Sequence, residues 1–177
     1  MILTTERLCL RPLLQSDAPA LFAIFSDAEA MRFWPRPAVT RLAVVEEMVR
    51  EQIAADDLCR YWTVWRQGDA IGSCDLSFIN RAEGHAETGF LFRRDQWGRG
   101  YAGEAMAAVA AHALGALGLA LLTASTHAQN ARARRVLERL GFGLERIVPD
   151  HTPMPGVRMD CALYALRRQA SIAQKGA

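Results

Sequence analysis

Lysine is almost missing from this chain of 177 residues, in which Lys175 is the only one. The 21 basic residues are therefore nearly all arginine, and 19 acidic residues leave a formal net charge of +2. A protein that coats nucleic acid neutralises many phosphates with a concentrated basic surface. The near balance of charge argues against that class, so we expect no nucleic-acid partner, although a small anionic ligand remains compatible.

Cysteine is scarce and scattered. The four cysteines contain no C-x-x-C pair and have no partner histidine at metal-ligand spacing. This pattern argues against a disulfide framework and against a zinc site. We therefore expect no metal.

Long apolar runs are also missing. The first twelve residues place charges where a signal peptide needs an apolar core, and Glu104 and His112 interrupt the alanine-rich stretch 101–122. We predict a cytoplasmic protein without a membrane partner. A chain of this length can bury about 70% of its unfolded surface in one domain, so we expect a single domain over residues 1–168 and a flexible tail over 169–177. A homodimer stays open.

The rest of the chain predicts an α+β fold. Ser16 and Thr40 are expected helix N-caps, and two prolines make 31–37 a loop that displays Phe33 and Trp34. Another Pro-rich loop is expected over 151–156. Alternating and short apolar segments predict strands over residues 7–11, 61–65, 71–79, 85–92, 119–126, 142–148 and 158–166.

Helical periodicity begins again at Tyr101, and Asn130 can cap a last helix that ends at Gly141. The three strands between residues 61 and 92 should form an antiparallel meander. We predict one mixed central sheet of about seven mostly antiparallel strands, flanked by about four helices.

The most informative segment joins a strand to a helix through Gly98, Gly100 and Gly103. Glycine lets backbone N–H groups approach a ligand closely, and a helix N-terminus offers unpaired N–H groups and a positive dipole end. The segment predicts a pyrophosphate cradle. The alternative is a helix-entry turn in which glycine serves packing alone.

The same spacing, G-x-G-x-x-G, is also the dinucleotide-binding fingerprint. That site needs an acidic residue, or an arginine in its place, about 20 positions further on. From Ala105 to Ala131 there is no charged residue of either sign, and the turn follows an antiparallel meander rather than opening the fold. Dinucleotide binding is therefore not expected.

Two motifs carry a family resemblance: Trp-Gly-Arg-Gly-Tyr-Ala-Gly-Glu-Ala at 97–105, and Asn-x6-Leu-x3-Gly-Phe at 130–142. With the Arg-Leu-x-Leu-Arg-Pro opening at 7–12, the chain resembles the GNAT acetyltransferase superfamily over nearly its whole length. It is similar to the RimJ/RimL-type branch, which acetylates ribosomal-protein N-termini. The resemblance implies an acetyl-CoA-dependent N-acetyltransferase that acts by direct transfer to a primary amine, either a protein N-terminus or a small molecule.

The resemblance also implies a cofactor site. The family pattern (Arg/Gln)-x-x-Gly-x-(Gly/Ala) falls on residues 97–102, with Trp97 as a departure that this branch shares. The pantetheine arm should pair like an added strand where the fourth and fifth strands splay apart, and backbone N–H groups there should polarise the thioester. The implied cofactor-binding residues are Phe90, Leu91, Phe92, Trp97, Gly98, Arg99, Gly100, Tyr101, Ala102, Gly103, Asn130 and Arg134.

The sequence offers two candidate catalytic residues, both carboxylates. An α-amine has a pKa near 8, so a weak base suffices. Glu87 is the first candidate, by resemblance, and Asp75 on the neighbouring strand is the second. Ala133 and Leu137 stand where relatives carry a serine and a tyrosine that can protonate the thiolate. A non-catalytic acyl-CoA-binding or regulatory domain therefore stays open as the alternative function.

Overall fold

The computed structural model describes residues 1–34, 36–55, 58–154 and 157–168. Its eight strands form one sheet in the order β1-β2-β3-β4-β5-β6-β8-β7, which confirms the predicted mixed, mostly antiparallel architecture. The strands are β1 (Leu3–Thr4), β2 (Cys9–Pro12), β3 (Arg60–Arg66), β4 (Asp69–Asn80), β5 (His85–Phe92), β6 (Leu121–His127), β7 (Gly143–Met154) and β8 (Val157–Arg167). The α-helices are α1 (Ala18–Phe25), α2 (Leu42–Ala54), α3 (Tyr101–Ala111) and α4 (Ala131–Arg139).

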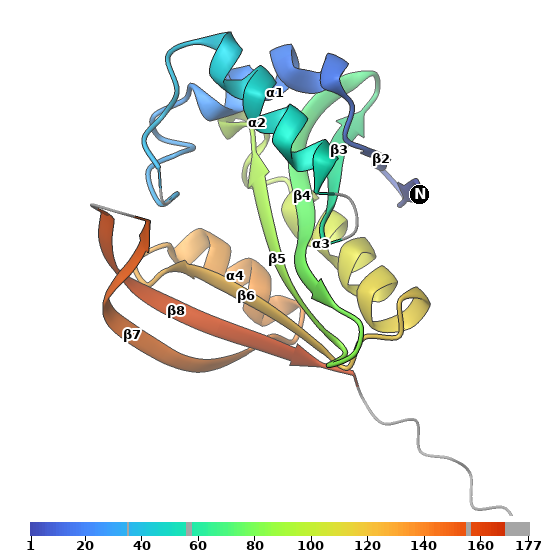
Figure 1. Cartoon of the computed structure of the whole chain (residues 1–177), viewed down its shortest axis with the longest axis vertical. Coiled ribbons are helices and arrows are strands. Elements are labelled where there is room, and N and C mark those ends of the chain that lie inside the picture. Colours follow the sequence, from blue (N-terminus) through green and yellow to red (C-terminus); the bar gives the residue numbers. More distant parts are fainter. Residues whose placement is uncertain (35, 56–57, 155–156, 169–177) are drawn as a thin grey trace, which may run out of the picture.

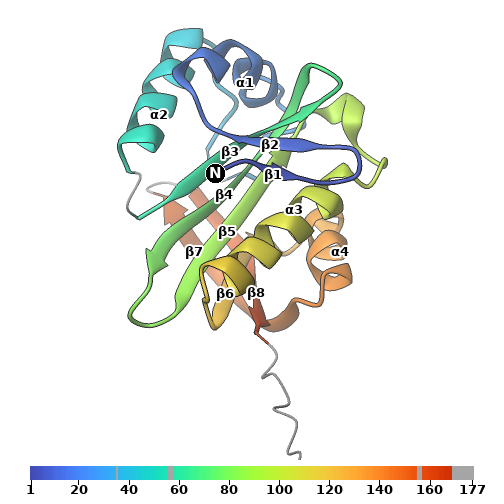
Figure 2. The same ribbon diagram turned by 90° about the vertical axis from the view of Figure 1, so that its right-hand side faces the viewer.

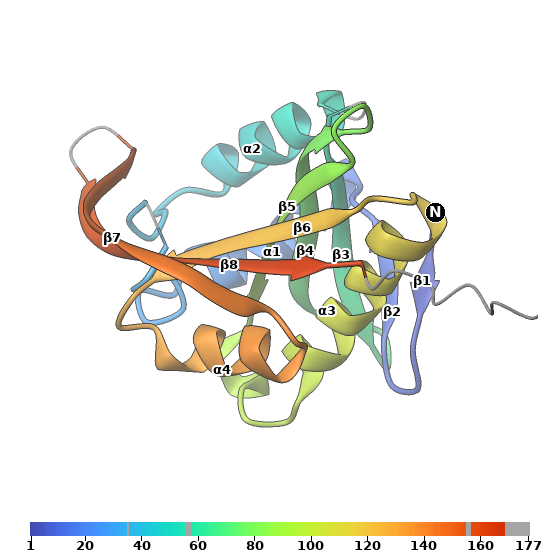
Figure 3. The same cartoon turned by 90° about the horizontal axis from the view of Figure 1, so that it is seen from below.

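The helices cover both faces of the sheet. Helices α1 and α2 lie on one face, and α3 and α4 lie on the other (Figure 3). The core beneath α3 and α4 includes Leu76, Met106 and Leu122, whereas Leu21 and Val45 belong to a separate cluster beneath α1 and α2. None of the helices in the described part of the chain is long and apolar enough to cross a bilayer.

Strands β3, β4 and β5 form the predicted antiparallel meander. Its register places Tyr61 opposite Asp75, and Asp75 opposite Gly89. Side chains of directly opposed residues lie on the same face of a sheet. The meander therefore aligns these three positions in one row, on the face covered by α1 and α2.

The only parallel pair in the sheet order joins β5 to β6. Their pairing covers His85 with Leu121, Ala86 with Leu122 and Glu87 with Thr123, and then stops. The two strands meet at one end and fan apart at the other (Figure 1). This confirms the predicted splay; the fourth and fifth expected strands are β5 and β6 because β1 adds a strand that the sequence did not predict.

The helix N-caps predicted at Ser16 and Thr40 are wrong. Ser16 lies in a 3₁₀ turn (Gln15–Asp17), and Asp17 occupies the N-cap of α1. Asp17 does not cap through its side chain, because its carboxylate accepts from the Leu14 N–H and the Thr63 hydroxyl. Helix α2 begins after Arg41, again without a side-chain cap, rather than at Thr40.

The predicted loop over 151–156 is wrong for most of its length. Strand β7 continues to Met154, where it still pairs with Val157 of β8. Because β7 is the outermost strand, a proline in it need not remove a ladder hydrogen bond. Residues 155–156 and the predicted tail 169–177 lie outside the described residues.

Candidate active site

The glycine turn connects the open end of β5 to α3. After β5, a 3₁₀ turn (Arg94–Gln96) leads to Gly98 and Gly100, whose φ angles of +76° and +82° lie in the left-handed region that favours glycine. Gly100 is the N-cap of α3. The turn therefore depends on glycine at two positions immediately before the helix.

Backbone N–H groups converge on this turn without partners of their own. Within the described chain, the N–H groups of residues 98 to 103 make no hydrogen bond, and the first helical bond runs from the Glu104 N–H to the Gly100 carbonyl at 3.1 Å. Unpaired N–H groups at a positive helix end form an anion site. The N–H groups of the predicted cofactor residues Gly98 to Gly103 are thus free to bind an anion.

The splayed edge of β5 offers further backbone groups. The Arg93 N–H donates to the carbonyl of Ile71 in β4, the neighbouring strand, at 2.9 Å. Because successive residues of a strand alternate in direction, the backbone of Leu91 also faces β4, whereas those of Phe90 and Phe92 face the gap. The Leu91 side chain packs with the core beneath α1 and α2. Of the three predicted residues, Phe90 and Phe92 therefore border the opening with their backbone groups.

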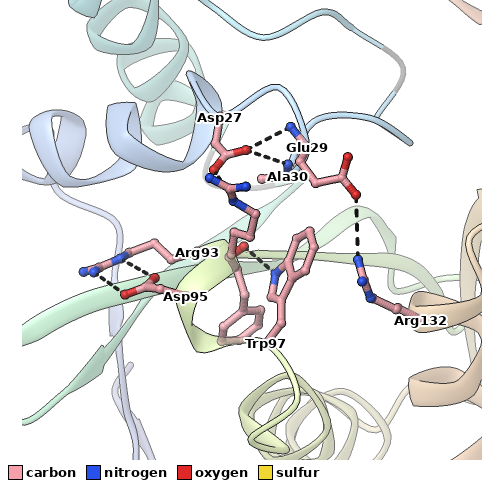
Figure 4. A network of polar contacts seen from close by, with 9 residues as sticks. Asp27, Glu29, Ala30, Arg93, Asp95, Trp97 and Arg132 are labelled. Atoms are coloured by element: carbon pink, nitrogen blue, oxygen red, sulfur yellow. Dashed lines mark hydrogen bonds and ion pairs between the residues drawn. The ribbon is translucent and has the colours of Figure 1, made fainter.

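Trp97 fixes the start of the turn. Its indole N–H donates to the Phe92 carbonyl at 2.9 Å, and the Arg132 guanidinium lies 4.6 Å from its ring centre. Arg132 also pairs with Glu29 at 3.9 Å, while Arg94 pairs with Asp27 at 2.9 Å. Figure 4 shows these contacts, which link the loop after α1 to both sides of the opening.

Two carboxylates lie on the sheet face beneath α1 and α2. Asp75 accepts a hydrogen bond from the Ser77 hydroxyl at 2.7 Å, and Glu87 accepts one from the Ser125 hydroxyl at 2.8 Å. A Cβ atom on Gly89 would lie 2.8 Å from Asp75 Oδ1. The absence of a side chain at Gly89 therefore gives the Asp75 carboxylate room to lie over β5.

The electrostatics of this face set Asp75 apart. Burial raises the pKa of Asp75, the Ser77 hydrogen bond lowers it, and the nearby charge of Glu87 raises it; together they place the pKa at about 6. Burial, a hydrogen bond with Cys59 and the charge of Asp75 also raise the pKa of Tyr61. Asp75 thus titrates close to neutrality beside a phenol that stays protonated.

A small cavity adjoins this carboxylate. It has a volume of about 30 Å³, which suffices for one water molecule. Its polar side includes Tyr61, Ser73 and Asp75, and its apolar side includes Leu21, Phe25 and Trp34. Trp34, predicted to be displayed by a loop, therefore lies near the candidate catalytic group.

Residues at the start of α4 divide between structural contacts and the opening. The Asn130 side chain accepts from the Ala133 N–H at 3.2 Å, which confirms the predicted cap, and donates to Thr126 at 3.3 Å. The Arg134 side chain donates to the Tyr164 hydroxyl at 2.8 Å and to the Ala128 carbonyl at 3.1 Å. Internal contacts thus engage Arg134, whereas its neighbour Arg132 reaches Trp97 and Glu29.

Sequence reasoning missed several residues of this region. Ser77 and Ser125 position the two carboxylates, and Tyr61 lies beside Asp75. The strand register contains the signal for Ser77 and Tyr61, because a meander with short turns fixes which residues face each other. Nothing in the sequence pairs Ser125 with Glu87, since those two strands diverge immediately beyond this contact.

Comparisons with known proteins agree with this fold. A model of the acetyltransferase (GNAT) domain matches residues 7–143. The uncharacterized N-acetyltransferase p20 of Bacillus licheniformis is 26% identical over 171 residues, which span 94% of this chain and 96% of that protein. A GNAT-family acetyltransferase from Bacillus anthracis has a TM-score of 0.85 at 22% identity, covering 95% of this chain and 99% of its own. RimL, a ribosomal L7/L12 α-N-protein acetyltransferase solved with coenzyme A, has a TM-score of 0.84 at 20% identity, with coverages of 94% and 98%.

Proposed function

The chain belongs to the GNAT acetyltransferase family and is an N-acetyltransferase; from this premise we propose where it binds acetyl-CoA and how it transfers the acetyl group. Two neighbouring features carry the proposal. The β5–β6 pairing ends at Glu87 and Thr123, which leaves the rest of β5 unpaired on that side, and the turn that follows β5 has unpaired N–H groups. One opening thus offers a sheet edge for the pantetheine arm and an anion site for the diphosphate.

The acetyl donor would lie along β5. The N–H groups of residues 98 to 103 hold its diphosphate, and the pantetheine amides pair with the backbone of Phe90 and Phe92 across the gap. The thioester then lies towards the fork at Glu87. An N–H group of β5 would donate to the thioester oxygen, stabilising the negative charge that develops there in acyl transfer.

Asp75 is the residue best suited to accept the proton. The neutral amine attacks the thioester carbon, a C–N bond forms, the C–S bond breaks, and the amine nitrogen loses one proton to the Asp75 carboxylate. The thiolate leaves and takes up one proton from water, and Asp75 returns its proton to water, so that the two proton transfers balance and the carboxylate is restored. A pKa of about 6 makes Asp75 a stronger base than an ordinary aspartate while leaving it ionised at neutral pH. Of the two carboxylates, we therefore favour Asp75, which the sequence ranked second.

The acceptor is a primary amine, and we favour the α-amine of a protein N-terminus. RimL, which shares the fold, is described as an α-N-protein acetyltransferase, and the chain carries sequence motifs of that branch. An α-amine with a pKa near 8 is neutral far more often at pH 7 than a lysine amine with a pKa near 10.4. A single carboxylate with a modestly raised pKa can therefore serve it.

The test combines binding with turnover. Purified protein is titrated with coenzyme A, and thiol release from acetyl-CoA is then measured with a panel of N-terminal peptides, polyamines and aminoglycosides, with products identified by mass spectrometry. We expect coenzyme A binding and acetylation of at least one peptide α-amine. Acetylation confined to small-molecule amines would overturn the assigned acceptor class.

The alternative function rests on Ala133 and Leu137. In the described structure Ala133 contributes only its N–H, to the Asn130 side chain, and Leu137 is buried, so that neither can protonate a thiolate. Binding of coenzyme A without turnover on any amine of the panel would favour a non-catalytic acyl-CoA-binding domain.

Glu87→Gln should lower turnover about threefold to tenfold with little change in the Kd for coenzyme A. Removal of the Glu87 charge takes away one cause of the raised pKa of Asp75, so the acid limb of the kcat/KM profile should move to lower pH. The measurement is kcat/KM between pH 5 and 9. Complete loss of the acid limb would instead identify Glu87 as the base, and an unchanged profile would remove it from the proton chemistry.

A further inference from the structure

The turn between β1 and β2 contacts the first turn of α3 although the two segments lie far apart in the sequence. Figure 2 shows this N-terminal hairpin beside α3. The contact centres on Glu104, the fourth residue of α3, and on Thr5 and Arg7 of the hairpin turn.

The Glu104 carboxylate is saturated with donors from the hairpin. Its Oε1 accepts from the Thr5 hydroxyl at 2.5 Å and from the Arg7 N–H at 2.9 Å, and its Oε2 accepts from Arg7 Nε at 2.6 Å. Arg7 Nη2 also lies 2.6 Å from Oε2. Such charge-assisted contacts are stronger than neutral hydrogen bonds.

Glu104 stays ionised in this environment. Burial alone would raise its pKa, but the hydrogen bonds from Thr5 and Arg7 and the charge of Arg7 outweigh burial and lower the pKa below its usual range. A negative charge is thus held in the first turn of α3. Left free, it would repel an anion bound at the same helix end.

Arg7 also touches the glycine turn itself. Its Nη1 donates to the Arg99 carbonyl at 3.2 Å, and its Nη2 lies 3.5 Å from the place where a Cβ of Gly100 would stand. The guanidinium lies 4.7 Å from the Tyr101 ring centre. One side chain therefore neutralises Glu104 and occupies a carbonyl oxygen that would otherwise add negative potential beside the cradle.

We propose that Arg7 is a positioning residue for the coenzyme A diphosphate: it clamps Glu104 onto the hairpin and keeps that carboxylate away from the N–H groups of residues 98 to 103. This inference rests on the proposed cofactor site and adds to it a residue from near the N-terminus, 97 positions before Glu104. Arg7 acts through Glu104 and the turn and needs no contact with the cofactor.

The test is a double-mutant cycle read by the Kd for coenzyme A at low and at moderate salt. Arg7→Ala should raise the Kd about tenfold, because Glu104 is then free and charged beside the cradle. Glu104→Gln alone should change the Kd less than about threefold. The double variant Arg7→Ala/Glu104→Gln should return to within about threefold of the wild type, and the Arg7→Ala defect should shrink as salt screens the charge.

Arg66→Ala is a matched control that removes a positive charge near Tyr101 but leaves the Arg7–Glu104 contact in place. The Arg66 guanidinium lies 5.3 Å from the same Tyr101 ring, but no contact joins it to Glu104 within the described residues. Arg66→Ala should therefore leave the Kd within about twofold of the wild type. An Arg66→Ala defect as large as that of Arg7→Ala would overturn the clamp.

Other results of the binding and kinetic measurements would support or overturn the proposed role of Arg7. If the double variant binds as weakly as Arg7→Ala while its thermal unfolding is unchanged, Arg7 acts directly on the anion and the inference fails. If Arg7→Ala raises the KM for acetyl-CoA with kcat little changed, as expected for lost ground-state binding, the inference is supported. If the wild type binds no coenzyme A, the proposed function falls together with it, whereas wild-type binding without coupling in the cycle overturns the inference alone.

Discussion

Asp75→Asn is expected to slow acetyl transfer at pH 7.5 by about 100-fold or more and, at the same time, to make the protein more stable. The rate falls because general-base catalysis typically contributes 10²-fold to 10⁴-fold, and an amide cannot take the proton of the amine. The acid limb of the kcat/KM profile, expected near the Asp75 pKa of about 6, should disappear. Asp69→Asn, at the start of the same strand on an exposed residue, is the matched control and should retain the wild-type rate.

The stability gain follows from the direction of the pKa shift. Because folding raises the pKa of Asp75 to about 6 from a usual 3.8, the folded state holds a proton that the unfolded state has already released between those pH values. Stability contributed by this group is present below about pH 4 and is lost as the pH rises through 6, by at most roughly 3 kcal/mol.

Urea unfolding at several pH values measures this effect. The difference in unfolding free energy between Asp75→Asn and the wild type should grow from near zero at pH 4 to a maximum above pH 7. A variant that is less stable than the wild type at pH 8 would show that the ionised carboxylate is not strained by its burial. Retention of both the rate and the acid limb would exclude Asp75 as the base.

Gly100→Ala is expected to weaken coenzyme A binding by about tenfold or more, together with a loss of stability of about 1 to 2 kcal/mol. The left-handed φ of +82° at Gly100 is unfavourable for a residue with a Cβ atom. The new Cβ would meet Arg7 only at 3.5 Å, an ordinary contact, so the strain lies in the backbone. Relaxation of that strain would turn the N–H groups at the start of α3 away from a bound diphosphate.

Gly118→Ala provides the matched control for this prediction. Gly118 has a φ of +68°, and its nearest neighbour for an added Cβ is Arg168 at 3.8 Å. Helix α3 continues into a π-helical turn (His112–Ala116), and Gly118 follows that turn, at the end away from Gly100. Gly118→Ala should therefore show a similar stability loss without a change in the Kd for coenzyme A. Isothermal titration and thermal unfolding of both variants make the comparison. Equal, unchanged affinities in the two variants would contradict a diphosphate site at Gly100.

Local patterns predicted most of the fold. The alternation in β4 and β5 and the glycines between strands report local geometry, and the structure places those strands within a few residues of the prediction. The short β1 escaped prediction, because two residues carry no periodicity. The cap predictions at Ser16 and Thr40 failed because the start of a helix depends on tertiary contacts. The Asp17 carboxylate, at the start of α1, accepts a hydrogen bond from Thr63 of β3.

The candidate site was predictable only in part. The turn at Gly98 and Gly100 could be predicted because its glycines and the helix start that follows lie within a few consecutive residues. The reach of Asp75 over Gly89 depends on the register of two strands, and the Arg7–Glu104 contact joins residues 97 positions apart. Single-sequence reasoning has no access to such pairs, since neither residue changes the local pattern around the other.

The seam between β5 and β6 divides the sheet into two blocks, β1–β5 and β6–β8, each with its own complete ladder. One pair of opposed residues could be added to or lost from the β5–β6 pairing without disrupting the hydrogen bonds within either block. In the binding mode that we propose, the last pair, Glu87 opposite Thr123, would limit how far an acyl chain can extend between the two strands. Loss of this one pair would lengthen the gap between β5 and β6 and make room for a longer acyl group, with both blocks of the sheet left intact.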